Sequence, residues 1–419
     1  MNGLRAALAG LTTRGRCLLA AGLALLACAF GLGQRDFLRG GVFLVALPLA
    51  AVAIVSRTRY RLACTRQLDP ARVESGRPTT VRLRLSNVSR LPSGVLLMED
   101  TLPYTLGGRP RFVLDRVEPH GERDVSYPVR ADVRGRYPIG PLAVRLTDPF
   151  GLVELSRSFA STDDLVVTPP IMPLPTVRLG GDWAGGGDTG TRAVAASGTD
   201  DAATREYRHG DDLRKVHWRS TARVGELMVR REEQPFQSRA TLLLDGRLQA
   251  HRGDGPGSSF EYAVSAVASV GVALARAGFV LRMVNETGTD VAPPAVALTE
   301  GVLLDALALV RPSRIPHLQA ATRRLRTSVD GVLVAVLGAL DLEDADRLAR
   351  LRVGTGTCVA VLLDTDSWAP GGSGPRSAAA TRVAQLLTGA GWRVLPVAHG
   401  VPLSAVWEQA GMRTVRSAS

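Results

Sequence analysis

Residues 205–223 read REYRHGDDLRKVHWRSTAR, and the rest of the chain is organised around this stretch. Arginines alternate here with acidic residues, and Tyr207 and Trp218 lie among them. A run of one charge sign indicates a disordered tail, whereas mixed signs with aromatic residues indicate a folded segment whose charges pair with one another. An apolar N-terminus and a region of short strands precede this stretch, and an α/β pattern follows it.

These changes of pattern predict a membrane-anchored protein with several domains. With 419 residues, 45% of them hydrophobic and 21% charged, the chain has the composition of folded domains rather than of a disordered protein. The boundaries that we expect are a transmembrane hairpin at 1–60, a β-sandwich-like domain at 61–170, a Gly-rich linker at 171–200, a signature segment at 201–238 and an α/β domain at 239–419.

Two apolar runs predict the membrane hairpin. They cover residues 17–33 and 40–55, and Phe37 and Leu38 extend the second run across Arg39. Each run is close to the roughly 20 residues that a spanning helix needs. Alone, the first run would also fit a signal peptide. The second run directly behind it favours an anchor, and arginines flank the pair on both outer sides. The positive-inside rule then places both ends in the cytoplasm, so we expect an inner-membrane protein with cytoplasmic domains.

The net charge of +12 fits either an anionic membrane surface or a nucleic acid. No nucleic-acid motif accompanies the charge, so we expect the membrane as the partner and no nucleic acid. The four cysteines, Cys17, Cys28, Cys64 and Cys358, have no metal-site or disulfide spacing, and reduced thiols are expected.

The period of the hydrophobic pattern separates the two large regions. Residues 79–87 alternate with period two, and further short runs up to residue 170 predict a β-sandwich. From residue 239 onward, apolar strands alternate with amphipathic helices such as 259–277, which predicts a mostly parallel sheet covered on both faces. The alternation at 227–230 predicts one more strand, which we expect to join this sheet.

The signature segment also resembles a known family, the bacterial "domain of unknown function 58" family. The resemblance rests on Arg205, Glu206, Tyr207, Gly210, Asp211, Arg214, His217, Trp218, Ala222 and Arg223. It implies a membrane-anchored N-terminus, a β-rich region and a C-terminal region similar to a von Willebrand factor A domain. Residues 134–141 and 148–152 resemble the family as well, and the second of them has the pattern of a turn.

A von Willebrand factor A domain holds a divalent metal at the end of its first strand through an Asp-x-Ser-x-Ser motif. Here the matching run begins at Asp245 and reads DGRLQ, so both serines are absent and Arg247 adds a positive charge. Hard cations prefer oxygen ligands, and this run offers one carboxylate. Asp245 is therefore a weak metal candidate that we expect to cap a turn, and no metal or cofactor is predicted.

The signature admits a structural and a catalytic interpretation. In the structural one, it is a charged clasp between the β-rich and α/β regions, with or without a docking surface for a partner. Asp211 or Asp212 caps a helix, Glu206 pairs with an arginine such as Arg223, and Trp218 is packed.

In the catalytic interpretation, His217 and Asp211 form an acid–base pair. Ser220 has no surrounding Gly-x-Ser-x-Gly pattern, so a nucleophile is not indicated. The chain is therefore predicted not to be an enzyme.

We expect a membrane-anchored scaffold or adaptor that acts through protein–protein contacts. The resemblance implies a MoxR-type AAA ATPase and a transglutaminase-like membrane protein as partners, in assembly or envelope maintenance. The alternatives are a divalent-metal-dependent ligand binder of the von Willebrand factor A type and an enzyme that uses His217 and Asp211.

Overall fold

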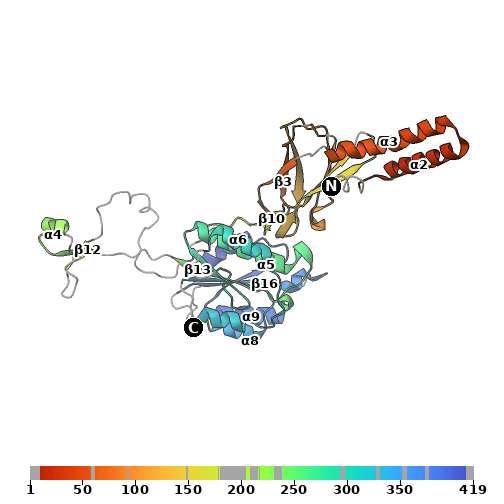
Figure 1. Cartoon of the computed structure of the whole chain (residues 1–419). Helices are drawn as coiled ribbons and strands as arrows, with labels where there is room; N and C mark the ends of the chain where they lie inside the picture. Colours follow the sequence, from red (N-terminus) through yellow and green to blue (C-terminus); the bar gives the residue numbers. More distant parts are fainter. Residues whose placement is uncertain are drawn as a thin grey trace. The chain divides into compact units, whose positions relative to one another are not determined.

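The computed structural model describes most of the chain (Figure 1). The described residues are 10–57, 62–90, 92–93, 95–147, 150–177, 179, 204–207, 216, 218–230, 238–292, 298–326, 331–351, 356–372 and 377–411. Two compact units are present. The first contains Met1–Ile171, Asp254–Gly257 and Leu303–Arg311, and the second contains Met172–Gly253, Ser258–Val302 and Pro312–Ser419. Most of the predicted Gly-rich linker, from residue 180 to 200, lies outside the described residues.

The first unit begins with two long apolar helices, α2 (Thr13–Leu32) and α3 (Arg35–Arg57). By length and composition, Thr13–Leu32 and Arg35–Ala53 could each cross a membrane. Thr12 starts α2, because its hydroxyl accepts a hydrogen bond from the Gly15 amide at 3.2 Å. The helix α3 begins at Arg35, two residues before Phe37 and Leu38, which extend the predicted apolar run across Arg39.

The two helices approach closely where each has a glycine. A Cβ atom added to Gly22 would lie 2.7 Å from a Val45 methyl and 3.0 Å from the Val45 amide nitrogen. Gly41 lies on the facing side, with the Gly22 carbonyl oxygen 3.0 Å from where its Cβ would be. Small residues allow this close contact between helix backbones, as in membrane-embedded helix pairs.

We therefore expect Gly22→Val to force the helices apart and to destabilise the hairpin by about 1–3 kcal/mol, the usual cost of overpacking. The measurement is the temperature at which the detergent-solubilised full chain loses helical circular dichroism and aggregates. Gly31→Val is the matched control, because nothing lies within 4 Å of a Cβ at Gly31 in the same helix. Equal effects of the two substitutions would contradict the close contact.

A β-rich region follows the hairpin and contains three antiparallel or mixed sheets. Their strand orders are β1-β3-β6, β2-β10-β7 and β5-β4-β8-β9. The strands are β1 (Leu62–Asp69), β2 (Arg72–Glu74), β3 (Pro78–Asn87), β4 (Leu96–Asp100), β5 (Arg111–Leu114), β6 (Glu122–Arg130), β7 (Gly135–Ile139), β8 (Leu142–Thr147), β9 (Glu154–Phe159) and β10 (Asp163–Thr168). The predicted β-rich region is thus present.

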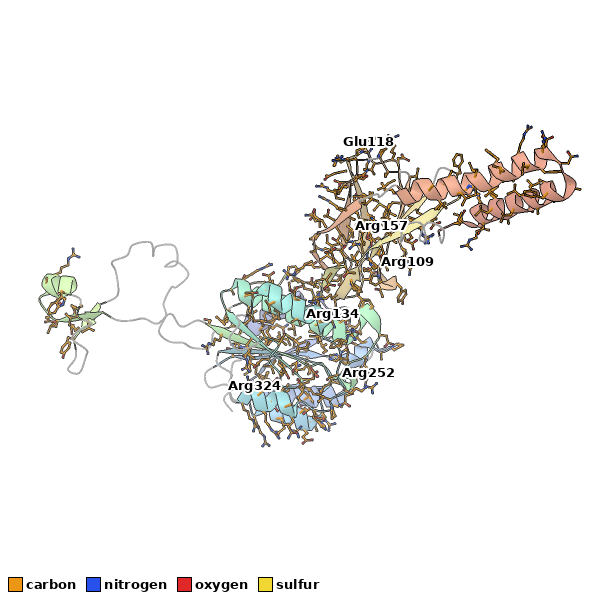
Figure 2. The ribbon with its side chains drawn as sticks, viewed as in Figure 1. Arg109, Glu118, Arg134, Arg157, Arg252 and Arg324 are labelled. Atoms are coloured by element: carbon orange, nitrogen blue, oxygen red, sulfur yellow. The ribbon has the colours of Figure 1, made fainter. Side chains whose placement is uncertain are left out.

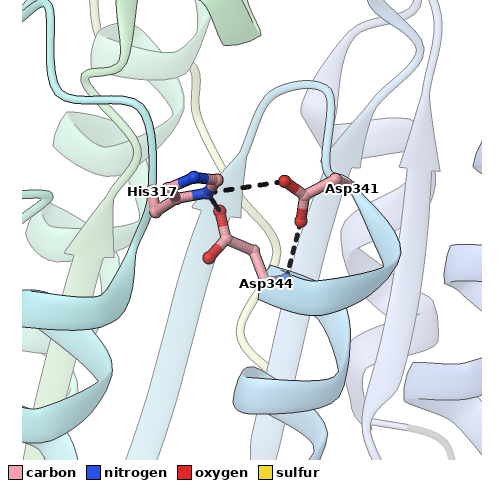
Figure 3. Close-up of side chains that lie close together, drawn as sticks. All are labelled: His317, Asp341 and Asp344. Atoms are coloured by element: carbon pink, nitrogen blue, oxygen red, sulfur yellow. Dashed lines mark hydrogen bonds and ion pairs between the residues drawn. The ribbon is translucent and has the colours of Figure 1, made fainter.

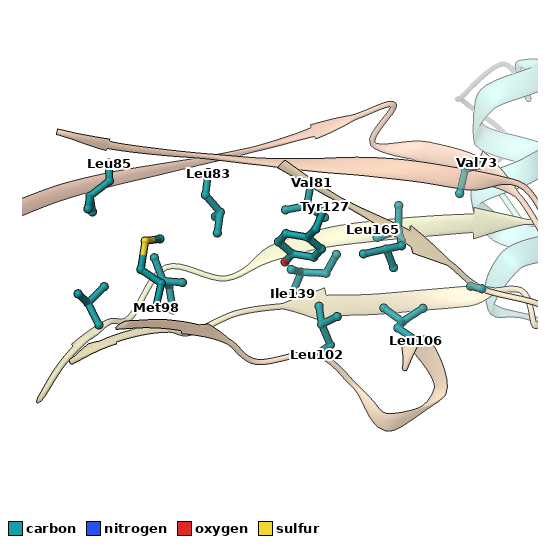
Figure 4. Packing of buried hydrophobic residues seen from close by; sticks show 14 of the residues in the cluster. Val73, Val81, Leu83, Leu85, Met98, Leu102, Leu106, Tyr127, Ile139 and Leu165 are labelled. Atoms are coloured by element: carbon teal, nitrogen blue, oxygen red, sulfur yellow. The ribbon is translucent and has the colours of Figure 1, made fainter. Parts of the chain in front are cut away.

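The core of this region lies between strand layers (Figure 4). In β3, Val81, Leu83 and Leu85 are buried while Arg82 and Arg84 are exposed, as the period-two pattern predicts. Met98 and Leu142 face them from β4 and β8. Apolar side chains from different sheets therefore share one core.

Hydrogen bonds tie the hairpin to the β-rich region within the same unit. Leu11 forms an antiparallel bridge with Val153, and the Thr12 amide donates to the Leu152 carbonyl at 2.9 Å. Leu11, Leu152 and Val153 form a small apolar cluster with Ala51 and Val52 near the end of α3. The start of α2 and the end of α3 therefore both contact the turn before β9.

The second unit contains a parallel five-stranded sheet with strand order β14-β13-β15-β16-β17. In chain order the elements from residue 239 onward are β13 (Arg239–Leu244), α5 (Ser259–Arg276), β14 (Val280–Asn285), α6 (Glu300–Leu309), α7 (Gln319–Arg326), β15 (Val332–Leu337), α8 (Leu342–Ala349), β16 (Cys358–Leu363), α9 (Ala378–Gly389), β17 (Arg393–Val397) and α10 (Leu403–Trp407). Most of α6, from Leu303 onward, belongs to the first unit. Figure 1 shows α5 on one face of the sheet and α8 and α9 on the other. The predicted α/β region is thus confirmed.

Candidate functional site

The signature segment forms a small antiparallel ribbon with one helix. Strands β11 (Thr204–Glu206) and β12 (Met228–Arg230) pair with each other, and α4 (Trp218–Val224) lies between them in the sequence. The Thr221 hydroxyl accepts a hydrogen bond from the Met228 amide at 3.0 Å, which joins the helix to the ribbon. The prediction that 227–230 joins the C-terminal sheet is wrong, because β12 pairs with β11.

The predicted signature residues have different positions in this ribbon. Arg205 lies in β11, Glu206 and Arg223 are exposed, and Tyr207 is half-buried. Trp218 is 70% exposed at the start of α4, so the prediction that it is packed is wrong. Gly210, Asp211, Asp212, Arg214 and His217 lie outside the described residues.

The carboxyl edge of the parallel sheet is the second candidate site. The chain passes from β13 to β14 and then crosses back to β15 on the other side of β13, so the strand order reverses between β13 and β15. Ligands of open parallel sheets bind at such a reversal. Here Asp245 directly follows β13, and its carboxylate is fully buried.

The guanidinium of Arg247 occupies this position. Its Nε and Nη2 donate to Oδ1 and Oδ2 of Asp245, each at 2.9 Å, and its Nη1 donates to Oδ2 of Asp344 at 2.8 Å. Burial lowers the pKa of Arg247, but hydrogen bonding and charge from Asp245 outweigh this and raise it above its ordinary value. The Asp245 carboxylate also accepts from the backbone amides of Arg247 and Gly338, each at 3.2 Å, which matches the predicted turn-capping role.

This geometry does not fit a metal ion at Asp245. Both carboxylate oxygens already bind the guanidinium, so a cation would have to displace a buried arginine. The positive charge of the Arg247 guanidinium would also repel a metal ion placed beside it. The sequence pattern indicates the charge of Arg247 but not its contact with Asp344, which lies 97 residues further along the chain.

A third group of ionisable side chains lies beside Asp344 (Figure 3). The Nδ1 atom of His317 lies 3.5 Å from Asp341 and 3.7 Å from Asp344. Three potential ligand atoms thus lie close together. However, Asp344 is already paired with Arg247 at 2.8 Å and Arg347 at 3.0 Å, and it accepts the Leu318 amide at 3.1 Å. Because two arginines neutralise Asp344, the group extends the arginine network and is a poor match for a cation.

His251 joins the same edge of the sheet. It is buried, its Nε2 lies 2.7 Å from the Asp245 carbonyl oxygen, and its Nδ1 lies 3.2 Å from the Ser259 hydroxyl. The carbonyl can only accept, so Nε2 carries a proton, and a neutral ring satisfies both contacts. Burial lowers the pKa of His251 below its ordinary value of 6.5. The charge and carbonyl of Asp245 oppose this shift without reversing it, and the charges of Arg247 and Arg252 (Arg252 is labelled in Figure 2) add to it.

The stability of the α/β region is therefore expected to fall as the pH drops below 6.5. There the unfolded chain binds a proton at this histidine that the folded chain resists, so stability rises with pH by up to about 1.4 kcal/mol per pH unit. Urea unfolding followed through buried Trp392 and Trp407 measures the slope. His251→Gln, which retains an amide donor but does not titrate, should have a flatter slope, and an unchanged slope would contradict this assignment.

The part of the chain that holds the signature ribbon and the Arg247 network is similar to a known protein family. Residues 203–367 match the family described as "Protein of unknown function DUF58". This part of the chain is therefore similar to the DUF58 family. The matched residues begin just before β11 and extend through β16, so they include the signature ribbon and the Arg247 network.

The chain is 25% identical over 250 residues to "Uncharacterized protein YeaD" of Bacillus subtilis (strain 168). The alignment covers 58% of this chain and 61% of that relative, so the chain spans about three fifths of its length.

Solved structures that are similar to parts of the chain include two small domains. The CARDB domain of the PF1109 protein from Pyrococcus furiosus is 12% identical over 26% of this chain and 93% of that chain, with a TM-score of 0.20. The ASH/PapD-like domain of human CEP192 is 12% identical over 26% of this chain and 85% of that chain, with a TM-score of 0.18. TM-scores this low do not identify a fold.

Proposed function

We propose that the protein is a membrane-anchored adaptor whose signature ribbon is a docking surface for a partner protein. The observation that supports this most directly is the exposure of apolar side chains in the ribbon. Trp218 is 70%, Val224 59% and Leu227 40% exposed. Tryptophan is among the residues that most often dominate binding energy at protein interfaces. Docking therefore explains this segment better than an internal clasp does.

The α/β region, in this proposal, is a von Willebrand factor A-like domain that works without a metal. A buried arginine in place of a cation supports protein binding over metal-dependent ligand binding, because the arginine cannot exchange a ligand as a metal can. The two apolar helices would anchor the chain in the inner membrane with the folded domains in the cytoplasm.

The partner that we propose is a MoxR-type AAA ATPase, together with a transglutaminase-like membrane protein, in assembly or maintenance of the cell envelope. In this proposal the adaptor holds the ATPase at the membrane, and the ATPase hydrolyses ATP. This part rests on the family resemblance.

The test is Trp218→Ala in the full-length, membrane-embedded protein. We expect the melting temperature to be unchanged, because an exposed substitution alters stability by no more than about 0.5 kcal/mol. Copurification of the ATPase from detergent-solubilised membranes should be lost, since removing an interface tryptophan commonly costs about 2 kcal/mol or more. Mass spectrometry of the captured proteins measures this.

Tyr104→Ala is the matched control, because Tyr104 is a 92% exposed aromatic residue of the β-rich region. It should leave capture intact. If Trp218→Ala instead lowers the melting temperature by several degrees and leaves capture unchanged, the segment is a clasp and the docking proposal fails.

A further inference from the structure

The turn that precedes β9 lies at the base of the helical hairpin. The Thr12 hydroxyl donates to the Gly151 carbonyl at 2.7 Å, one residue before α2 begins. Leu152 and Val153 pack against Ala51 and Val52, which lie at the end of the apolar part of α3. Contacts to both helices therefore hold this turn at the end of the hairpin where α2 begins and the apolar part of α3 ends.

Phe150 extends from this turn and is 64% exposed. Arg14 and Arg16 are exposed in the first turn of α2, and the Arg14 guanidinium reaches to within 3.9 Å of where a Gly151 Cβ would lie. Phenylalanine together with basic side chains is typical of surfaces that lie in the membrane–water interface, and here both are at the end of a pair of apolar helices.

We infer that the Phe150 turn is a lipid-binding contact that inserts its ring into the interfacial layer of an anionic bilayer. This inference rests on the proposed membrane anchoring and adds a second, peripheral contact to it. The ring supplies apolar area at the depth of the headgroups, and Arg14 and Arg16 pair with lipid phosphates. The folded β-rich region then touches the membrane surface as well as being tethered to it.

A control position is available at the far end of the same sheet. Strands β4 and β8 pair so that Leu96 faces Leu146 and Asp100 faces Leu142. The Phe150 turn follows the Leu146 end of β8, whereas Tyr104 follows the Asp100 end of β4. Tyr104 is also aromatic and 92% exposed, so it differs from Phe150 mainly in its distance from the hairpin.

The experiment places a fluorescent label in the full chain. In a variant with all four native cysteines replaced by alanine, Phe150→Cys or Tyr104→Cys is labelled with an environment-sensitive nitrobenzoxadiazole dye. Each protein is reconstituted into vesicles of phosphatidylcholine and phosphatidylglycerol, with or without lipids spin-labelled close to the headgroup. Flotation and resistance to alkaline extraction report separately whether the hairpin is inserted.

We expect a blue shift and strong loss of fluorescence with spin-labelled lipid at position 150, and neither effect at position 104. If the protein floats with the vesicles but position 150 is not quenched, the lipid contact is wrong while the anchor stands. A blue shift without lipid quenching would indicate a protein contact and would also overturn the inference. If the protein fails to float, both the anchor and the lipid contact are wrong.

Discussion

Arg247→Ala is expected to lower the free energy of unfolding of the α/β region by about 3–5 kcal/mol, the usual cost of removing one partner of a buried ion pair. Arg247 is 2% exposed, and the carboxylates of Asp245 and Asp344 on either side of it are fully buried. Alanine would leave both carboxylates without their common counter-ion in a region that excludes water. This group is also where the strand order reverses, so β13, β15 and α8 should loosen together.

Urea unfolding followed through Trp392 and Trp407 measures this loss, because both indoles are buried in the α/β region. Arg350→Ala is the matched control. Its pair with Asp346 is as short, at 2.7 Å, but the side chains are 69% and 47% exposed. Exposed pairs contribute at most about 1 kcal/mol, so equal losses from the two variants would show that the Arg247 network has no special structural role.

The β-rich region should respond in the same way to Asp100→Ala. The Asp100 carboxylate is completely buried and binds Arg66 at 2.8 Å and the Tyr127 hydroxyl at 2.6 Å. Removing it leaves a buried guanidinium and a buried phenol without their main acceptor, so we expect a loss of about 3–5 kcal/mol. The measurement is hydrogen exchange of the β3 amides by mass spectrometry. This measurement reports on the β-rich region alone, whereas Trp392 and Trp407 report on the α/β region.

Asp124→Ala provides the comparison for Asp100→Ala. Asp124 binds the Nε and Nη2 of Arg84 at 2.9 Å and 3.0 Å, but this pair is exposed. These contacts are about as long as those of Asp100, but solvent surrounds them. We therefore expect Asp124→Ala to leave hydrogen exchange in β3 unchanged. Matching protection losses in the two variants would mean that burial does not decide the contribution of these ion pairs.

The sequence pattern predicted the elements of the parallel sheet well, because strands buried on both faces are almost entirely apolar. Every residue of Val332–Leu337 and of Cys358–Leu363 is buried, for example. The helix Gln319–Arg326 was not predicted, since its inward face offers only Ala321, Thr322 and Leu325. A short basic helix of this type has too few apolar residues for its period to be recognised.

The errors in the signature segment have a different cause. Alternation at 227–230 correctly indicated a strand, but alternation does not specify which strand it pairs with. Trp218 was expected to be packed because tryptophan is usually buried, yet the exposure of a residue depends on what covers its element. Likewise, the contact of Arg247 with Asp344 joins positions far apart in the chain, and only the topology of the sheet brings them together.

The way in which the hairpin joins the β-rich region has a mechanical consequence. The chain continues from α3 towards β1, and the strand bridge between Leu11 and Val153 adds a second point of attachment at the start of α2. A body held by one flexible connection can swivel about it, whereas a body held at two points resists rotation. Torque applied to the β-rich region is therefore transmitted to both helices at once.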